Sequence, residues 1–155
     1  MDGYAIAVRK DCSVEPTKTY VRDWMTQEPA TVRPETSAVE AYEQMRSRKI
    51  HRMPVVDAAG RLVGIVTSSD IEGAVSFRHT EAGWHEGRFA LAGTTVVEVM
   101  TREPLTVTPT TSMHETASLL LSNHLSGLPV VEENKLVGII TETDVFRLVV
   151  ALCAA

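Results

Sequence analysis

The sequence predicts an α+β fold, layered like an α/β sandwich, built from two β-α-β-β-α units related by a pseudo-two-fold axis. The first observation is an internal repeat: residues 21–37 return as residues 96–112, and residues 53–70 return as residues 128–144. Such a repeat indicates one supersecondary unit used twice, because a single unit cannot bury its own apolar face. The second observation is a pair of continuous apolar strands, LVGIVT and LVGIIT, which imply burial against helices or on both faces. Two such units leave two equivalent clefts between them.

The beginning of each copy predicts a short helical turn followed by a short strand. Thr95 and Glu98 have capping-box spacing, which favours one helical turn. The β-branched pairs at 31–32 and 106–107 are each followed by a proline two residues later and suit a short strand.

The middle of each copy predicts an amphipathic helix. Ser37-x-x-Glu40 and Ser112-x-x-Glu115 are capping boxes at matching positions, and apolar residues recur after each with helical spacing.

The end of each copy predicts a β-hairpin and a second helix. The strand pairs are 54–56 with 62–67 and 129–131 with 136–141, each joined by turn residues. A final helix is expected to begin near residue 68 and again near residue 142.

These elements divide the chain into four segments. Residues 1–18 form an N-terminal extension, 19–75 the first unit, and 94–152 the second unit. The segment 76–93 between them breaks the pattern and is expected to be a functional excursion, a partner contact or a partly disordered loop.

Composition excludes several classes of function. The net charge of −5 argues against non-specific nucleic-acid binding, which needs a basic surface. No signal peptide is apparent, and the apolar tail 145–155 is too short to span a bilayer. The two cysteines, far apart in the chain, are expected to be reduced thiols. We therefore expect a cytoplasmic protein without a membrane segment.

The motif with the clearest chemistry is Thr-x-x-Asp, which ends both apolar strands. It occurs as Thr67 to Asp70 and as Thr141 to Asp144. One interpretation is a helix cap. The other is a ribose site, in which the carboxylate accepts hydrogen bonds from the diol while the hydroxyl and helix amides face phosphate.

The repeated motifs VMT-xx-P-x-TV, PVV-[DE] and LVGI[VI]T-xx-D together resemble the cystathionine β-synthase (CBS) domain, present twice as a tandem pair, or Bateman module. The resemblance covers nearly all of residues 19–150. It implies a regulatory module that binds an adenosyl ligand, such as AMP, ADP, ATP or S-adenosylmethionine, and signals to a protein partner. It also implies a homodimer formed through the helices 113–125 and 145–152, no required cofactor and no catalytic activity.

The resemblance also assigns site residues by position. Asp70 and Asp144 match ribose-binding aspartates. Thr67, Thr141, His51 and Arg52 match the phosphate side. The adenine or cleft wall would comprise Thr26, Thr31, Ile50, Met53, Pro54, Thr101, Thr106, Leu125, Ser126, Gly127 and Pro129.

The family pattern combines the aspartate of one copy with the early segment of the other. Asp70 is therefore expected to face Thr101, Thr106 and residues 125–126. Asp144 is expected to face Thr26, Thr31 and residues 50–51.

The copies differ just before the Pro-Val-Val strand, where His51-Arg52 stands opposite Ser126-Gly127. An arginine fork suits phosphate, so we expect the cleft of Asp70, which has Arg52 in its own copy, to bind phosphate more tightly. The alternative is that Arg52 and Lys49 only solvate a helix end. Arg46 and Arg48 are interpreted as surface charges.

The alternatives to a ligand sensor are an enzyme, a metal site and an interaction scaffold. No nucleophile elbow, phosphate loop or paired-carboxylate arrangement supports an enzyme. No metal signature is present, although His79, His85, Glu81 and Glu86 could gather a metal in the inter-repeat loop. The main alternative to a ligand sensor is a dimerisation or interaction scaffold that binds no small molecule.

Overall fold

The computed structural model describes residues 19–76, 91 and 93–153, and shows an α+β fold of two similar units. The first copy supplies η1 (Val21–Asp23), β1 (Thr26–Gln27), α1 (Ala38–Arg48), β2 (Arg52–Val56), β3 (Leu62–Thr67) and α2 (Ser68–Ser76). The second supplies α4 (Val96–Val99), β4 (Thr101–Arg102), α5 (Met113–Ser122), β5 (Gly127–Glu132), β6 (Lys135–Thr141) and α6 (Glu142–Cys153). The N-terminal extension and most of the inter-repeat segment lie outside the described residues.

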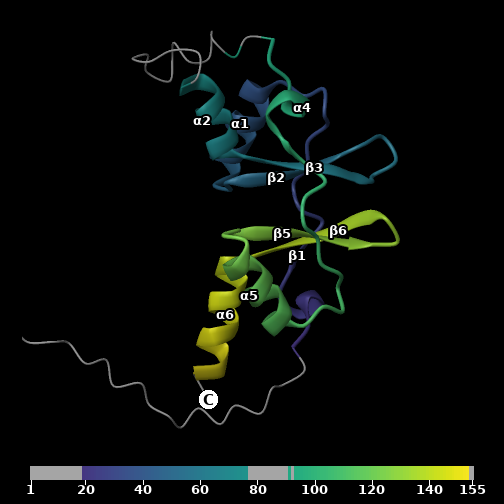
Figure 1. The fold of residues 1–155 in the computed structure, drawn as a ribbon, viewed down its shortest axis with the longest axis vertical. Helices are drawn as coiled ribbons and strands as arrows, with labels where there is room; N and C mark the ends of the chain where they lie inside the picture. Colours follow the sequence, from purple (N-terminus) through teal and green to yellow (C-terminus); the bar gives the residue numbers. More distant parts are fainter. Residues whose placement is uncertain (1–18, 77–90, 92, 154–155) are drawn as a thin grey trace, which may run out of the picture.

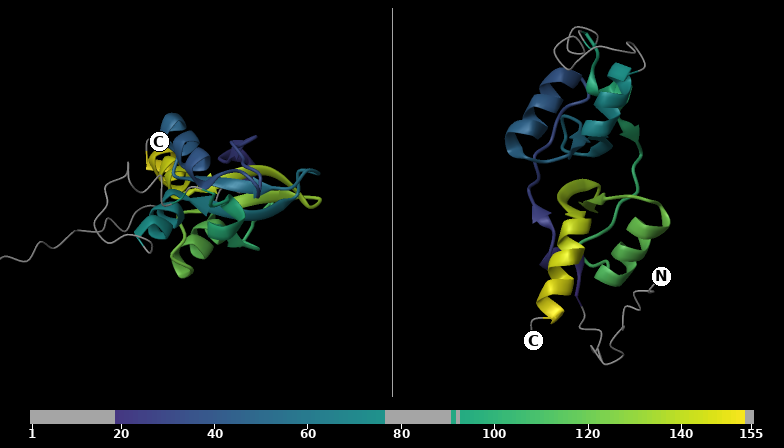
Figure 2. Two further views of the ribbon diagram at one scale, coloured as in Figure 1. Left: turned by 90° about the horizontal axis from the view of Figure 1, so that it is seen from above. Right: turned by 90° about the vertical axis from the view of Figure 1, so that its left-hand side faces the viewer.

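The two units are stacked with their sheets facing each other at the middle of the molecule (Figure 1). Helices α1 and α2 cover the outer side of one sheet, and α5 and α6 cover the outer side of the other. Both hairpins extend to the same side, as Figure 2 shows from above. Their turns touch, since the backbone N–H of Leu136 donates to the carbonyl of Gly60.

Each three-stranded sheet contains one strand from the other copy. The sheet orders are β2-β3-β4 and β1-β6-β5, all antiparallel. Thr26 lies opposite Ile139 of the second copy, and Thr101 lies opposite Ile65 of the first. The exchange ties the two copies together and carries the early segment of each copy to the Thr-x-x-Asp motif of the other.

The prediction of a strand at 31–32 and at 106–107 is wrong in position. The strands lie five residues earlier, and they end where Glu28 and Glu103 adopt a positive φ of 47° and 48°. Val32 and Val107 form only isolated parallel bridges, to Val55 and Val130. Each valine bonds the neighbouring strand through its own N–H and carbonyl, and the proline two residues later has no N–H with which to continue the pairing.

Two glycines of the repeat allow this exchange. A Cβ atom added at Gly138 would lie 2.6 Å from Sδ of Met25 and 3.0 Å from the carbonyl oxygen of Thr26. A Cβ at Gly64 would meet Met100 and Thr101 in the same way, at 2.5 and 2.9 Å. Real Cβ atoms do not approach so closely. The glycine of Leu-Val-Gly-Ile therefore allows the exchanged strand to lie against this position.

The core consists of two hydrophobic clusters, one in each unit. The first gathers around Met45, Val55 and Val66, and the second around Leu120 and Ile140. Each cluster also includes a valine from the other copy. Val96, which precedes β4, packs into the first cluster, and Val21, which precedes β1, packs into the second. The exchange therefore extends from the sheets into the core.

The helix starts follow the predicted caps in part. The helical turn at Thr95 and Glu98 is confirmed, with a reciprocal capping box. Ser112 caps α5 through its hydroxyl, which accepts from the backbone N–H of Glu115 at 3.1 Å. Ser37 occupies the cap position of α1 but makes no side-chain cap hydrogen bond.

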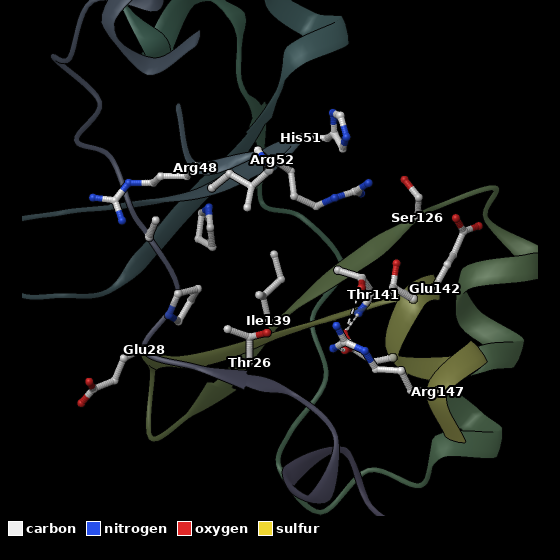
Figure 3. Close-up of a pocket in the computed structure, with 17 residues that line it drawn as sticks. Thr26, Glu28, Arg48, His51, Arg52, Ser126, Ile139, Thr141, Glu142 and Arg147 are labelled. Carbon is white, nitrogen blue, oxygen red and sulfur yellow. Dashed lines mark hydrogen bonds and ion pairs between the residues drawn. The ribbon is translucent and has the colours of Figure 1, made fainter. Parts of the chain in front are cut away.

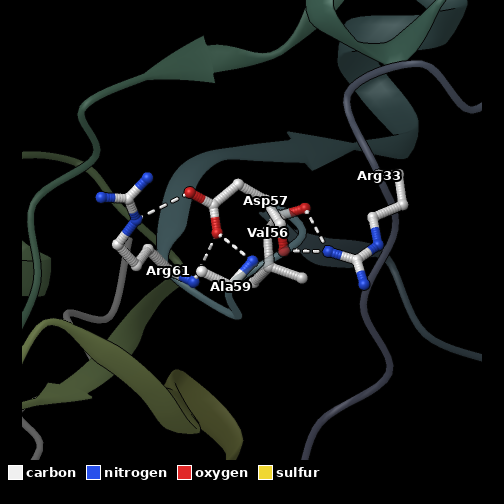
Figure 4. A network of polar contacts seen from close by, with 5 residues as sticks. All are labelled: Arg33, Val56, Asp57, Ala59 and Arg61. Carbon is white, nitrogen blue, oxygen red and sulfur yellow. Dashed lines mark hydrogen bonds and ion pairs between the residues drawn. The ribbon is translucent and has the colours of Figure 1, made fainter.

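The turn between β2 and β3 is fixed by a small polar network (Figure 4). Oδ1 of Asp57 accepts from the backbone N–H groups of Ala59 and Arg61, and Oδ2 accepts from Nε of Arg61 at 2.7 Å. Arg33 donates to the carbonyls of Val56 and Asp57. The hydrogen bonds from the backbone and side chain of Arg61 lower the pKa of Asp57.

Candidate ligand-binding clefts

The second Thr-x-x-Asp motif presents a buried carboxylate at the start of α6. Asp144 is 2% exposed. Its Oδ2 accepts two hydrogen bonds from Thr141, one from the backbone N–H and one from Oγ1, both at 2.9 Å. Its Oδ1 accepts from Nη1 of Arg147 at 3.0 Å. The motif forces this position because the strand ends at Thr141 and the first turn of the helix returns the carboxylate onto it.

The first motif repeats this geometry without the arginine. Oδ2 of Asp70 accepts from the N–H and Oγ1 of Thr67, both at 2.8 Å. The position one helical turn later, which holds Arg147 in the second copy, holds Gly73 in the first. Both carboxylates therefore cap their helices, and within the described residues only Asp144 has a cation paired with it.

A cavity of about 620 Å³ lies beside Asp144 and is lined by both copies (Figure 3). Its volume is within the range of small-molecule sites. Eight predicted site residues line it: Thr26, Ile50, His51, Arg52, Pro54, Ser126, Thr141 and Asp144. Asp144 thus lines one cavity with Thr26 and residues 50–51, as expected, whereas Thr31, expected there as well, does not line it.

The other predicted site residues do not line this cavity. They are Thr31, Met53, Thr67, Asp70, Thr101, Thr106, Leu125, Gly127 and Pro129. Met53 is fully buried in the core of the first unit. Thr101 lies opposite Ile65, two residues before Thr67, so the early segment of the second copy does reach the strand that ends at the Asp70 motif.

The prediction that gave Arg52 to the cleft of Asp70 is wrong. Arg52 lines the cavity of Asp144, and Ser126, also expected beside Asp70, lies there too. The reason is that the cleft is shared: a residue at the edge of one copy serves the aspartate of the other. In Figure 3 the Arg52 side chain extends from β2 toward Ser126 and Glu142.

Gly127 leaves the space that Arg52 occupies. A Cβ atom at Gly127 would lie 3.1 Å from Cδ and 3.2 Å from Nη1 of Arg52. Positions 52 and 127 correspond in the repeat, so they meet near the pseudo-two-fold axis, where only one can carry a large side chain. The difference between the copies thus decides which of two neighbouring clefts receives the arginine.

The cavity concentrates positive charge in an acidic chain. Its permanently charged cations are Arg48, Lys49, Arg52 and Arg147, and its carboxylates are Glu28, Glu142 and Asp144. At the positions matching Arg48, Lys49, His51 and Arg52, the second copy has Asn123, His124, Ser126 and Gly127. The matching elements of the Asp70 side therefore supply no lysine or arginine.

Arg52 is held in a poorly hydrated position. Burial lowers the pKa of its guanidinium, and the nearby carboxylate of Glu142 partly offsets this. Among the described residues its side chain makes no hydrogen bond. A half-buried guanidinium whose N–H groups make no hydrogen bond has donors available for an anion.

Sequence reasoning missed several residues of this cavity. The sequence pattern makes Arg48 a surface charge and gives Arg147 no site role, yet both line the cavity. A signal for Arg147 was present, because a residue three positions after Asp144 on a helix shares its face.

No group of three or more His, Cys, Asp or Glu side chains among the described residues could hold a metal ion. The histidines and glutamates of the inter-repeat loop lie outside that part. No helix in the described part of the chain is long and apolar enough to cross a membrane.

Comparison with known sequences identifies both copies. The sequence profile of the CBS domain matches residues 21–76 and 96–151. The chain is 34% identical over 124 residues to the CBS domain-containing protein YhcV of Bacillus subtilis, covering 80% of this chain and 81% of that protein. It is 37% identical over 134 residues to the homoserine O-acetyltransferase of Methanococcoides burtonii, covering 86% of this chain and 25% of that enzyme. The chain thus spans about a quarter of the length of such enzymes.

Solved structures with the same fold contain adenosyl ligands. CBSX2, a protein of Arabidopsis thaliana, in complex with AMP superimposes with a TM-score of 0.74 and 32% identity, over 86% of this chain and 97% of that chain. The CBS domain pair of protein MJ0100, in complex with 5-methylthioadenosine and S-adenosyl-L-methionine, gives a TM-score of 0.72 and 31% identity, over 84% and 99%.

Proposed function

This chain belongs to the CBS domain family as a tandem pair, and from that premise we propose that it is a regulatory module that binds an adenosyl ligand and signals to a partner. The observation that carries the proposal is the cavity beside Asp144. It joins a carboxylate at a helix start to a group of cations, the two kinds of group that ribose and phosphate require.

Each part of the cavity suits one part of such a ligand. The buried carboxylate of Asp144 would accept from a ribose diol. Arg52 and the first turn of α6 would face phosphate. Ile50, Pro54 and Ile139 form an apolar wall suited to adenine. The excess of cations favours a phosphorylated ligand such as AMP over cationic S-adenosylmethionine at this cleft.

The Asp70 side would form the second cleft, with Thr67, Thr101, Thr106, Leu125, Gly127 and Pro129 as its proposed wall. Its aspartate has the same hydrogen bonds to threonine, and its matching positions have no lysine or arginine. It therefore suits an adenosyl group with no phosphate, or with a net positive charge.

Thermal denaturation with AMP, ADP, ATP and S-adenosylmethionine tests the proposal. A ligand at about 100 times its dissociation constant adds about 2.7 kcal/mol to the free energy of unfolding. For a chain of this size, Tm is then expected to rise by about 5–10 °C with at least one of them. If Tm stays unchanged with all four at millimolar concentration, the proposal is rejected.

A ligand-free scaffold is the second candidate, and an apolar helix surface favours it. Leu121 on α5 and Phe146, Val149 and Val150 on α6 are exposed by 50% or more. The first copy has Arg46 and Glu72 at the positions of Leu121 and Phe146. This surface supports a homodimer, which is compatible with either function.

The proposal includes no catalytic activity, no required cofactor and a cytoplasmic location. The enzyme names among the relatives belong to proteins about four times the length of the matched region, so their activities are not transferred to this chain. The downstream partner would be a separate protein or a fused domain.

A further inference from the structure

We propose that Arg147 is the residue that makes the cleft of Asp144 selective for phosphorylated ligands, by leaving the aspartate for the phosphate when the ligand enters. The inference rests on the proposed function and concerns the same cleft. The two Thr-x-x-Asp motifs differ three residues after the aspartate, where one copy has Arg147 and the other has Gly73, and Arg147 contacts the carboxylate directly.

The acceptor capacity of Asp144 is nearly filled in the absence of ligand. A carboxylate offers about four lone-pair sites, two on each oxygen. Thr141 uses both sites of Oδ2, and Arg147 uses one of the two sites of Oδ1. A ribose diol donates two hydrogen bonds, so it cannot place both on Oδ1 until Arg147 withdraws.

Arg147 is placed so that it can withdraw. Its side chain is 66% exposed, whereas that of Asp144 is 3% exposed, so the ion pair has one partner in water and one buried partner. Water reaches the guanidinium and screens the pair on that side, and the arginine gains side-chain freedom when it leaves.

A phosphate supplies the alternative partner. Arg147 lines the cavity from α6, while Arg52 enters from β2 on the opposite side (Figure 3). A phosphate carried by a ribose at Asp144 would lie between these two guanidinium groups, and each can bind it bidentately. An unphosphorylated nucleoside would break the ion pair without giving Arg147 a new partner, so its binding is disfavoured.

The other copy supplies the contrasting case. Gly73 stands at the position of Arg147, and a Cβ atom there would meet nothing within 4 Å. In the part of the chain that the structure describes, no arginine contacts Oδ1 of Asp70. In the cleft of Asp70, position 73 therefore supplies no arginine to compete with a ribose, although a side chain could start there without a clash.

Calorimetric titration of Arg147→Gln with AMP and with adenosine tests the proposal. Both are titrated into Asp70→Ala and into Asp70→Ala with Arg147→Gln, so that the cleft of Asp144 dominates the signal. Adding Arg147→Gln to Asp70→Ala should weaken the binding of AMP about tenfold or more. This is the effect of losing one charge-assisted contact to the phosphate. Adenosine should bind equally well or more tightly, because Asp144 has become free.

The matched control is Arg61→Gln. Arg61 is also 66% exposed and also pairs with an aspartate, Asp57, but it lies on the hairpin turn outside the cavity (Figure 4). Arg61→Gln should leave the affinities for AMP and for adenosine unchanged.

Conversely, Gly73→Arg in the otherwise unaltered chain should weaken the binding of adenosine in the cleft of Asp70.

The outcomes separate the inference from the function on which it rests. Equal weakening of AMP and adenosine by Arg147→Gln, or no change in either, overturns the role of Arg147 and leaves the ligand site standing. If the unaltered chain binds no adenosyl compound, the proposed function fails and the role of Arg147 fails with it.

Discussion

Replacing Asp144 with alanine is expected to abolish the stabilisation of this protein by AMP. The unaltered chain should gain about 2.7 kcal/mol, or about 5–10 °C in Tm, at 100 times the dissociation constant. The variant should gain nothing, because the carboxylate that would hold the ribose is gone. Without ligand, the variant should lose about 1–2 kcal/mol, the value of a helix cap, since two hydrogen bonds to Thr141 disappear.

The control for this experiment is Asp70→Ala, which removes the same cap from the first copy. It should lower ligand-free stability by a similar amount and keep the response to AMP. Asp144→Asn serves as a second variant if the alanine variant does not fold, because an amide oxygen can still accept from Thr141. A full AMP response in both Asp144 variants would show that the carboxylate of Asp144 only caps its helix.

Gly138→Val is expected to destabilise the fold and to disturb the cleft together. A Cβ atom at this position meets Sδ of Met25 at 2.6 Å and the carbonyl oxygen of Thr26 at 3.0 Å. The backbone oxygen belongs to the exchanged strand β1 and has no room to move without breaking its pairing with β6. Overpacking of this kind costs about 1–3 kcal/mol, which urea denaturation would measure.

The same variant should weaken AMP binding, because Thr26 lines the cavity. Gly73→Ala is the matched control: its Cβ meets nothing, and alanine in an exposed helix is favoured over glycine by about 1 kcal/mol. An unchanged free energy of unfolding in Gly138→Val would mean that the exchanged strand is not held as described.

The repeat and its motifs predicted the fold well, for a physical reason. Apolar strands, hairpin turns and the capping box at Thr95 are local patterns, and the structure realises them where the sequence places them. The exchanged strands at 26–27 and 101–102 are two residues long, too short for any periodicity. They are strands because they pair with β6 and β3 of the other copy, and no local pattern encodes a contact between such distant segments.

The residues of the cleft were harder to predict. The motif identified Thr141 and Asp144, and the cross-copy arrangement placed Thr26 beside them. It could not show which cleft Arg52 would enter, because positions 52 and 127 meet near the axis and either direction was compatible with the sequence. In the sequence, Arg48 has the pattern of any exposed helix cation, and only the cavity distinguishes it.

The central claim is that the cleft of Asp144 binds a phosphorylated adenosyl ligand. Calorimetric titration of the unaltered protein with AMP and, separately, with S-adenosylmethionine tests it most directly. The charges around Asp144 predict saturable AMP binding that weakens as salt is added, and that is lost in Asp144→Ala but kept in Asp70→Ala. AMP binding that survives in Asp144→Ala, or an Asp144-dependent preference for S-adenosylmethionine, would contradict it.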